Sequence, residues 1–443
     1  MHDIKVGMVS LGCPKNQVDA EVMLGYLADA GYRLIEDAAM ADVAIVNTCG
    51  FIESAKSEAI EEILELAQLK KEGRIRSLVV TGCLAERYRE EILRDMPEVD
   101  AVVGIGANSR IAEVVARSLQ ENGFSLYGEK TDLPLCGRRI QTTLPYYSYL
   151  KIADGCSNKC AYCAIPMIRG AFRSRPMEEL VEEARMLAAR GVKELTVVAQ
   201  DTTEYGSDLY GKRCLPELLR RLCEVEGIAW IRVLYCYPEK ITDELLDVMA
   251  QQPKMCKYID MPIQHVSSGV LRAMHRPGDR ATLAALVTHI REKVPGVVLR
   301  TTLLTAFPGE TQEDFEQLVD FVREAKFERL GCFIWSAEEG TEAFDLPGRV
   351  SAETAEQREE SILDEQSRVV DAWCRSMIGR RLTVIVEGYD RLAECCYGRS
   401  QGEAPDIDGK IFFDTDGRKF TMGDFTEVEI TDYMGCDLVG HTV

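Results

Sequence analysis

DGCSNKCAYCAIP, residues 154–166, places three cysteines in one loop directly after a predicted strand. Cys156, Cys160 and Cys163 follow the spacing C-x3-C-x2-C. Iron–sulfur clusters take Cys thiolates at short spacings of this kind, and three thiolates can hold three irons of a four-iron, four-sulfur cluster while the fourth iron stays open. Two alternatives remain, a zinc site and unliganded cysteines. Zinc usually needs a fourth ligand and a second C-x2-C pair, which this segment lacks.

The cysteine motif resembles the signature of the radical S-adenosylmethionine superfamily, including the aromatic Tyr162 before the last cysteine. In that superfamily the open iron chelates the amino and carboxylate groups of S-adenosylmethionine, and an electron from the cluster cleaves the sulfonium to give a 5′-deoxyadenosyl radical. The resemblance therefore implies S-adenosylmethionine as a cofactor, with Tyr162 at its site.

Strands and helices alternate from the cysteine loop onward. A helix is predicted at 177–191, and apolar strands are predicted at 194–200, 297–309 and 327–336. Such repeated strand–helix units over residues 142–376 predict a TIM-like barrel, full or partial, in which the chemistry lies at the carboxyl ends of the strands.

Several polar residues near these strand ends are candidates for the cofactor site. We predict that Gln200 and Asp201 hold the methionine or ribose part of the cofactor, and the alternative for Asp201 is a capping role in its loop. The segment FPGET, 307–311, is either close to the adenine or a plain turn. Arg173 and Arg175 are candidates for contact with the cofactor or a cluster, with a surface salt bridge as the alternative.

The first 125 residues predict a parallel α/β domain. Buried strands are expected at 4–10, 42–49 and 77–83, with helices between them, and residues 121–145 are expected to form a linker. Cys13, Cys49 and Cys83 each follow one of these strands. Because the carboxyl ends of parallel strands open on one edge of a sheet, these thiols can converge in space. The alternative is that they are small buried residues, since free Cys is among the most buried residue types.

The last part of the chain, residues 377–443, has a different pattern. It follows a long charged helix at 351–377 and consists of short alternating segments with Gly and Asp turns, which predict a small antiparallel barrel. It carries 7 Lys and Arg against 13 Asp and Glu, a net charge of −6.

The motifs taken in order resemble the methylthiotransferase family: SLGCPKN, NTCGFI, TGCLAERY, GCSNKCAYCAIP and RGAFRSRP. The resemblance covers essentially the whole chain. It implies that Cys13, Cys49 and Cys83 bind a second four-iron cluster with an open iron, and that the C-terminal barrel is a TRAM domain. It also implies transfer of a methylthio group to an unactivated carbon, in which one cluster carries the sulfur and the other cleaves S-adenosylmethionine.

Within this family the chain resembles the RimO-like branch, which modifies the β-carbon of an aspartate in small-subunit ribosomal protein twelve. The residues after Cys13, Pro-Lys-Asn, and the segment SQGEAPDIDGKIFF at 400–413 carry this resemblance. An acidic C-terminal barrel suits a basic ribosomal protein, whereas a barrel that grips RNA should be basic. Two mild departures from the family are Ala20 in place of the usual Ser and Asp154 in place of the usual Glu.

Two other functions remain as alternatives. One is a MiaB-like methylthiotransferase that acts on an adenosine of transfer RNA, and the other is a non-catalytic iron–sulfur electron carrier or RNA-binding protein. Release of 5′-deoxyadenosine separates an enzyme from a carrier.

The bulk composition agrees with an intracellular enzyme. The 443 residues carry a formal charge of −21, which argues against a large nucleic-acid surface. We find no apolar run long enough to span a membrane and no secretory signal, so we expect a cytoplasmic protein whose 16 cysteines serve metal binding rather than disulfides. We expect a monomer that receives electrons from a donor such as flavodoxin or ferredoxin.

Overall fold

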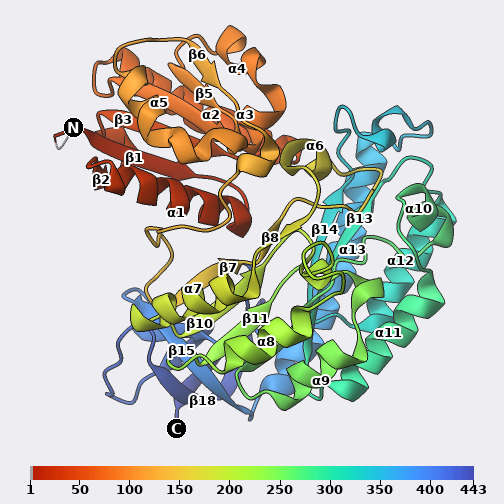
Figure 1. The fold of residues 1–443 in the computed structure, drawn as a ribbon. Coiled ribbons are helices and arrows are strands. Elements are labelled where there is room, and N and C mark those ends of the chain that lie inside the picture. Colours follow the sequence, from red (N-terminus) through yellow and green to blue (C-terminus); the bar gives the residue numbers. More distant parts are fainter. Residues whose placement is uncertain (1–2) are drawn as a thin grey trace.

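The computed structural model describes residues 3–443, in which three bodies of secondary structure follow one another along the chain. In Figure 1 an α/β unit lies at the top, a larger central unit lies below it, and a small barrel containing β15 and β18 lies at the bottom. The two smaller units therefore lie at opposite ends of the central one.

The N-terminal unit is a six-stranded parallel sheet in the order β2-β1-β3-β4-β5-β6. Its strands are β1 (Lys5–Ser10), β2 (Arg33–Ile35), β3 (Val43–Thr48), β4 (Ser77–Gly82), β5 (Ala101–Val103) and β6 (Phe124–Leu126). Its helices are α1 (Pro14–Asp29), α2 (Glu53–Lys71), α3 (Cys83–Tyr88), α4 (Glu90–Asp95) and α5 (Ile111–Ser118).

Helices cover both faces of this sheet, and this explains why its central strands are apolar throughout. In β3, Val43 and Ile45 pack toward α1 and α5, whereas Ala44 and Val46 pack toward α2. Successive side chains of a strand point to opposite faces, so a strand buried on both faces loses the usual polar alternation.

The central unit contains a second six-stranded parallel sheet, in the order β14-β13-β12-β11-β10-β7, which stays open between β7 and β14. Its strands are β7 (Tyr147–Lys151), β10 (Glu194–Val198), β11 (Trp230–Val233), β12 (Met255–Asp260), β13 (Val298–Thr305) and β14 (Arg329–Ile334). The longer helices around it are α7 (Met177–Ala189), α8 (Leu215–Cys223), α9 (Asp243–Gln251), α11 (Arg280–Lys293), α12 (Gln312–Ala325) and α13 (Ala352–Met377). The expected TIM-like barrel is therefore a partial one.

Shorter elements complete the central unit and the connections. The strands β8 (Ala153–Asp154) and β9 (Arg173–Ser174) pair antiparallel, and short helices are α6 (Ile165–Arg169) and α10 (Ser268–Ala273). Short 3₁₀ helices lie at Ala38–Met40, Ile105–Arg110, Lys130–Asp132, Thr202–Glu204, Pro238–Lys240 and Glu342–Asp345.

The C-terminal unit is a closed five-stranded barrel in the order β15-β16-β17-β19-β18. Its strands are β15 (Arg381–Asp390), β16 (Cys395–Arg399), β17 (Ile411–Asp414), β18 (Phe425–Met434) and β19 (Asp437–Thr442). Four of its pairings are antiparallel, but β17 and β19 run parallel, so the barrel is not purely antiparallel as the sequence predicted.

The segment between β16 and β17 docks onto the concave face of the central sheet. Asp406 accepts hydrogen bonds from Tyr147 Oη at 2.6 Å and Tyr149 Oη at 3.2 Å, and Asp408 accepts one from Tyr258 Oη at 2.7 Å. The 400–413 segment, which the sequence singled out as a mark of the RimO-like branch, is thus a contact between two units. Its two aspartates are engaged by tyrosines of the central unit rather than held free for a partner.

Sequence reasoning missed five short strands: β2, β5, β6, β9 and β16. The strand β6 lies within the region expected to be a linker, where it pairs with β5. Among residues 3–443, none of the helices combines the length and the apolar character that crossing a membrane requires.

Candidate functional site

The three closely spaced cysteines lie in the loop between β8 and α6, at the carboxyl end of the central sheet. Cys156 is buried, and Cys160 and Cys163 are partly buried. The loop leaves β8 through Gly155, whose φ is +74° and whose missing Cβ would lie 2.2 Å from the carbonyl oxygen of Ala171. Only glycine fits this turn without strain, so the DGC sequence is a requirement of the loop.

The predicted residue Asp201 lies beside this loop and is fully buried. Its carboxylate accepts hydrogen bonds from Lys240 Nζ and Asn158 Nδ2, both at 2.7 Å, and from Thr203 Oγ1 at 2.5 Å. It makes no capping hydrogen bond to the 3₁₀ turn that follows, so the alternative role is not observed. A pocket of about 140 Å³ opens here, lined by Cys156, Ser157, Asn158, Phe172, Asp201, Glu204, Arg213 and Lys240.

Gln200 is the neighbouring predicted residue, and its side-chain amide is buried with neither Oε1 nor Nε2 hydrogen-bonded. Buried polar atoms in folded proteins nearly always have a partner, so an orphaned amide at a strand end indicates a missing ligand or water. Tyr162, the third predicted cofactor residue, is partly buried and packs in a cluster with Ala161, Met274 and Phe307.

The other three cysteines lie at one edge of the N-terminal sheet. Cys13 follows β1, Cys49 follows β3 and Cys83 begins α3 directly after β4, and these three strands are neighbours. Gly12 has a φ of +89°, and a Cβ there would lie 2.7 Å from Cys49 Cβ and 3.0 Å from Cys49 Sγ. The first two cysteine loops are therefore in close contact.

Nearby cations act on these thiols. Burial works to raise the pKa of Cys13, but Lys15, Arg169 and the backbone N–H groups of Lys15 and Asn16 together lower it, and the net change is downward. Burial raises the pKa of Cys83 to about 12, against the opposing effect of Arg169. Binding of a metal would displace the proton of such a thiol.

The donor atoms of both cysteine sets are free thiols, the ligand type that iron–sulfur clusters normally take. Within residues 3–443, no three His, Cys, Asp or Glu side chains surround one point as a mononuclear metal site would require. In a four-iron cluster each thiolate binds a different iron, so the thiolates stand apart around a common volume. The thiol donor set agrees with iron–sulfur clusters.

The two cysteine sets adjoin each other across the contact between the units. Cys83 packs against Ala164 and Ile168, and Ala164 directly follows Cys163. Figure 1 shows α6 at this junction, between the upper unit and the central strands. From the other side, Lys15 Nζ lies 3.5 Å from the ring centroid of Tyr235, which follows β11.

Buried ion pairs hold this junction together. Arg169 NH1 donates to Asp19 at 2.8 Å and to Asp154 at 2.7 Å. Lys151 Nζ pairs with the same two carboxylates, at 2.8 Å from Asp154. Asp154, noted in the sequence as a mild departure from the family, therefore lies at the centre of an interdomain network.

A second set of ion pairs joins the loop after β14 to the N-terminal unit. Glu338 is buried and accepts hydrogen bonds from Arg87 NH1 at 2.6 Å and Lys56 Nζ at 3.2 Å. Arg87 also donates to the carbonyl oxygen of Gly50, next to Cys49, at 3.0 Å. The loop that carries Cys49 is thus fixed relative to the central unit.

Neither Arg173 nor Arg175 contacts a cysteine, and Arg175 forms a salt bridge, the interaction that the sequence offered as the alternative, although this one is buried. Arg173 donates to backbone carbonyls of Lys130 and Thr131, and Arg175 is buried and pairs with Glu183 at 2.6 Å. Arg169 is the arginine that reaches a cysteine. It belongs to the RGAFRSRP motif, which was therefore an available signal, but nothing in the motif distinguishes its three arginines.

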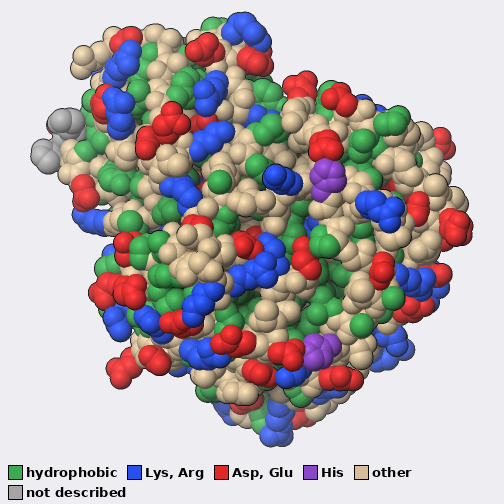
Figure 2. All heavy atoms as spheres, turned by 45° about the vertical axis from the view of Figure 1, so that its right-hand side comes forward, with side chains coloured by type: hydrophobic (Ala, Val, Ile, Leu, Met, Phe, Trp, Pro, Cys, Tyr) green, Lys and Arg blue, Asp and Glu red, His purple; other side chains and the backbone are tan. Residues whose placement is uncertain are grey.

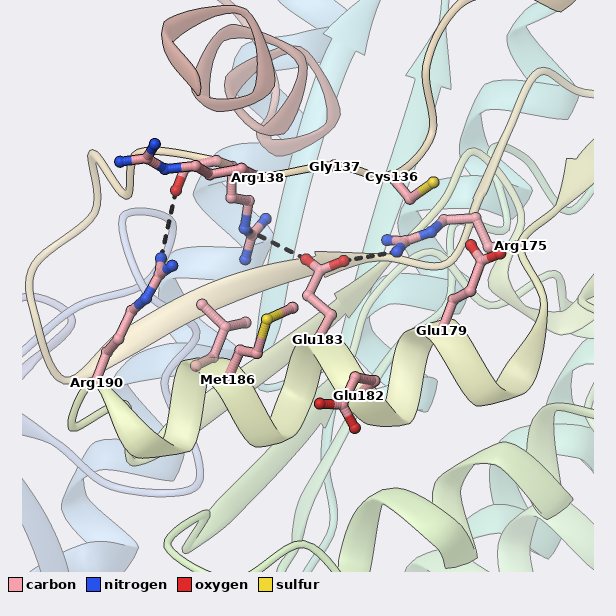
Figure 3. A pocket seen from close by; sticks show the side chains of 11 residues that line it. Cys136, Gly137, Arg138, Arg175, Glu179, Glu182, Glu183, Met186 and Arg190 are labelled. Atoms are coloured by element: carbon pink, nitrogen blue, oxygen red, sulfur yellow. Dashed lines mark hydrogen bonds and ion pairs between the residues drawn. The ribbon is translucent and has the colours of Figure 1, made fainter. Parts of the chain in front are cut away.

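Figure 3 shows a larger pocket of about 370 Å³, between the segment 136–139 and α7. Glu183 lies in its wall and pairs with Arg175 at 2.6 Å and Arg139 at 3.3 Å. This pocket is lined by none of the six candidate cluster cysteines, and its buried charges pair with one another, so we assign it no role in the chemistry.

Comparisons with known proteins agree with this division of the chain. Residues 5–104 match the family described as Uncharacterized protein family UPF0004, residues 150–322 match the Radical SAM superfamily, and residues 378–443 match the TRAM domain.

Full-length relatives decide the family. The chain is 47% identical over 440 residues to the Ribosomal protein uS12 methylthiotransferase RimO of Lachnoclostridium phytofermentans, which covers 99% of both chains. It is 48% identical over 442 residues to the protein of that name from Pelotomaculum thermopropionicum, again covering 99% of both. The chain belongs to the RimO family. The expected branch is thereby confirmed for this RimO-family protein, over the MiaB-like alternative.

Solved structures give the same fold. The radical S-adenosylmethionine methyltransferase TsrM of Kitasatospora setae superimposes with a TM-score of 0.57 at 15% identity, covering 78% of this RimO-family chain and 77% of TsrM. The cobalamin-dependent S-adenosylmethionine radical enzyme OxsB superimposes with a TM-score of 0.51 at 12% identity, covering 83% of this chain and 56% of OxsB. At these identities the likeness supports the fold of the RimO-family chain.

Proposed function

We propose that this protein is a radical S-adenosylmethionine methylthiotransferase that adds a methylthio group to the β-carbon of an aspartate in ribosomal protein uS12. The observation that carries the proposal is that Cys83, of one set of three cysteines, packs against Ala164, which directly follows Cys163 of the other set. The names of its full-length relatives support the substrate.

Two four-iron, four-sulfur clusters and S-adenosylmethionine are the cofactors of this proposal. Cys156, Cys160 and Cys163 hold one cluster, and Cys13, Cys49 and Cys83 hold the other. Tyr162, Gln200 and Asp201 line the cofactor site. When bound, the first cluster supplies the electron that cleaves S-adenosylmethionine into methionine and a 5′-deoxyadenosyl radical, and the second supplies the sulfur that another S-adenosylmethionine methylates.

The chain's own residues position and shield this chemistry. The β-hydrogens of aspartate have no useful acidity, so acid–base catalysis would not remove one, and a radical cofactor is needed. The ion pairs of Arg169 and Glu338 hold the two cysteine sets at a fixed position relative to each other. Lys15 Nζ, 3.5 Å from the ring centroid of Tyr235, adds a further contact between the N-terminal and central units.

Charge favours a protein substrate over transfer RNA. The TRAM barrel has a net charge of −6, and on the face shown in Figure 2 basic and acidic side chains are interspersed. Nucleic-acid binding relies on Lys and Arg gathered on one surface.

The proposal also includes that the protein acts in the cytoplasm as a monomer, with flavodoxin or ferredoxin as its electron donor.

Anaerobic assays test this function. Reconstituted protein is incubated with dithionite, S-adenosylmethionine and purified uS12, and in parallel with transfer RNA. We expect 5′-deoxyadenosine, and a uS12 peptide heavier by one methylthio group at an aspartate by mass spectrometry. Absence of 5′-deoxyadenosine would exclude the radical mechanism, and modification of transfer RNA alone would exclude the substrate.

A further inference from the structure

Arg169 contacts both cysteine sites from one position. It is the last residue of α6, is 1% exposed, and is followed by Gly170 with a φ of +78°. On the N-terminal side, its NH2 donates to Cys83 Sγ at 3.4 Å and to Asn16 Oδ1 at 3.3 Å. On the central side, NH1 donates to Asp154, two residues before Cys156.

The charge around Arg169 is balanced before any thiolate is counted. Arg169 and Lys151 face the two carboxylates of Asp19 and Asp154, and all four side chains are buried. The hydrogen bond to Cys83 is thus additional to a complete ion-pair quartet. A stability role alone would not require a guanidinium that also reaches a cysteine sulfur.

The planar fork of Arg explains why this residue type stands here. One guanidinium presents five donors in fixed directions, whereas the ammonium of Lys is a compact point charge. Arg169 uses the fork to hold four acceptors from three segments, Asn16 and Asp19, Cys83, and Asp154. A Lys at 169 would keep the charge but would lose this geometry.

We propose that Arg169 is a positioning residue that couples the two cluster sites, by donating to the sulfur of Cys83 while anchoring the strand end that leads into the C-x3-C-x2-C loop. This inference rests on the proposed function. Hydrogen bonds to cluster sulfurs raise the reduction potential of an iron–sulfur cluster. Arg169 therefore raises the potential of the N-terminal cluster and fixes its place relative to the cofactor site.

The test begins with a chain that holds only the N-terminal cluster. In a Cys156→Ala, Cys160→Ala, Cys163→Ala background, we compare the redox titration and electron paramagnetic resonance spectrum with and without Arg169→Lys. We expect a midpoint shifted to more negative potential and an altered spectrum. In the otherwise native holoenzyme, Arg169→Lys should lower methylthiolated uS12 per 5′-deoxyadenosine by roughly tenfold to a hundredfold, as expected for a misplaced reacting group.

Arg232→Lys is the matched control. Arg232 is also fully buried and pairs with Glu194 at 2.8 Å, and it donates to the backbone of Gln401 in the C-terminal unit, at the opposite end of the central sheet. The Arg232→Lys variant should be less stable than the wild type. It should keep the same reduction potential of the N-terminal cluster and the same amount of methylthiolated uS12 per 5′-deoxyadenosine. An unchanged potential and ratio in Arg169→Lys, or equal changes in both variants, would overturn the inference.

Two further arms keep the outcome decisive. If Arg169→Lys does not fold, Asp19→Asn removes one anchor of Arg169 without touching a cysteine, and it should shift the same potential in the same direction by less. If Asp19→Asn leaves the potential of the N-terminal cluster unchanged, this result counts against the inference. If the triple-alanine chain holds no iron, the proposed function itself fails. This result differs from the one that would overturn the inference alone, in which the N-terminal cluster forms but its potential is the same with and without Arg169→Lys.

Discussion

Replacing Glu194 by Gln tests how the TRAM barrel is attached to the central unit. Glu194 begins β10 and is fully buried. It accepts hydrogen bonds from Arg232 Nε and Arg399 NH2, both at 2.8 Å. Burial works to raise the pKa of Glu194, but the two arginines lower it by more. The carboxylate therefore stays ionised at neutral pH and neutralises two buried cations.

The free-energy cost of Glu194→Gln depends on which partners Arg399 and Arg232 keep in the variant. Arg399 keeps Glu387 at 2.5 Å, whereas Arg232 loses its carboxylate and keeps backbone carbonyls. Removing one partner of a buried ion pair costs about 3–5 kcal/mol. Because Arg399 stays paired, we expect about 3 kcal/mol, which is roughly a hundredfold in the opening equilibrium of this contact.

Hydrogen exchange measures this opening. Amides of β15, β16 and residues 399–408 should exchange faster in Glu194→Gln, while those of β3 and β4 should not change. Glu429→Gln is the control, because Glu429 pairs with Arg381 on the exposed side of the same barrel and such pairs contribute about 0.2–1 kcal/mol. A loss in Glu194→Gln no larger than that of the control would refute the reasoning.

Three other outcomes are expected. Cys49→Ala should abolish methylthiolation but permit some cleavage of S-adenosylmethionine, whereas Cys160→Ala should abolish cleavage; 5′-deoxyadenosine from Cys160→Ala would contradict the assignment of the two clusters. Reconstituted wild-type protein should hold roughly eight irons by colorimetric assay, and alanine at Cys156, Cys160 and Cys163 should leave about half; a wild-type value near four would remove the N-terminal cluster. Glu338→Gln should loosen the contact between the N-terminal and central units at neutral pH, as seen by hydrogen exchange of α2 and α3. Burial works to raise the pKa of Glu338, but its contacts with Ser336, Arg87 and Lys56 lower the pKa by more. The ionised carboxylate therefore stabilises the contact between the units above about pH 4, and this stabilisation is lost as the pH falls through the pKa of Glu338 in the folded protein. The variant and wild type should therefore converge in acid, and a difference that persists there would contradict this reasoning.

The order of elements and the chemistry of the cluster loop could be predicted from the sequence, because both depend on local patterns. Apolar runs gave the main strands of both parallel sheets to within a few residues, and the spacing of Cys156, Cys160 and Cys163 indicated an iron–sulfur cluster. Short strands such as β6 were missed, since three residues carry too little periodicity to stand out from a linker.

Which of the candidate site residues lie close together was decided by the tertiary structure. The sequence placed Cys13, Cys49 and Cys83 at strand ends, but their closeness depends on β1, β3 and β4 being neighbours in the sheet. It did not distinguish Arg169 from Arg173 and Arg175, because all three have the same chemistry, and the difference arises only where α6 meets another unit.

The two aspartates at 406 and 408 show the same limit. The net charge of the barrel suggested attraction to a basic partner, yet the fold pairs these two of its aspartates with tyrosines of the central sheet. Local sequence determines which backbone conformations and ligand types are available over a few residues. Which side chains meet across many tens of residues depends on how whole units pack, as with Cys83 and Arg169, and that packing is settled by the summed burial of many contacts rather than by any motif.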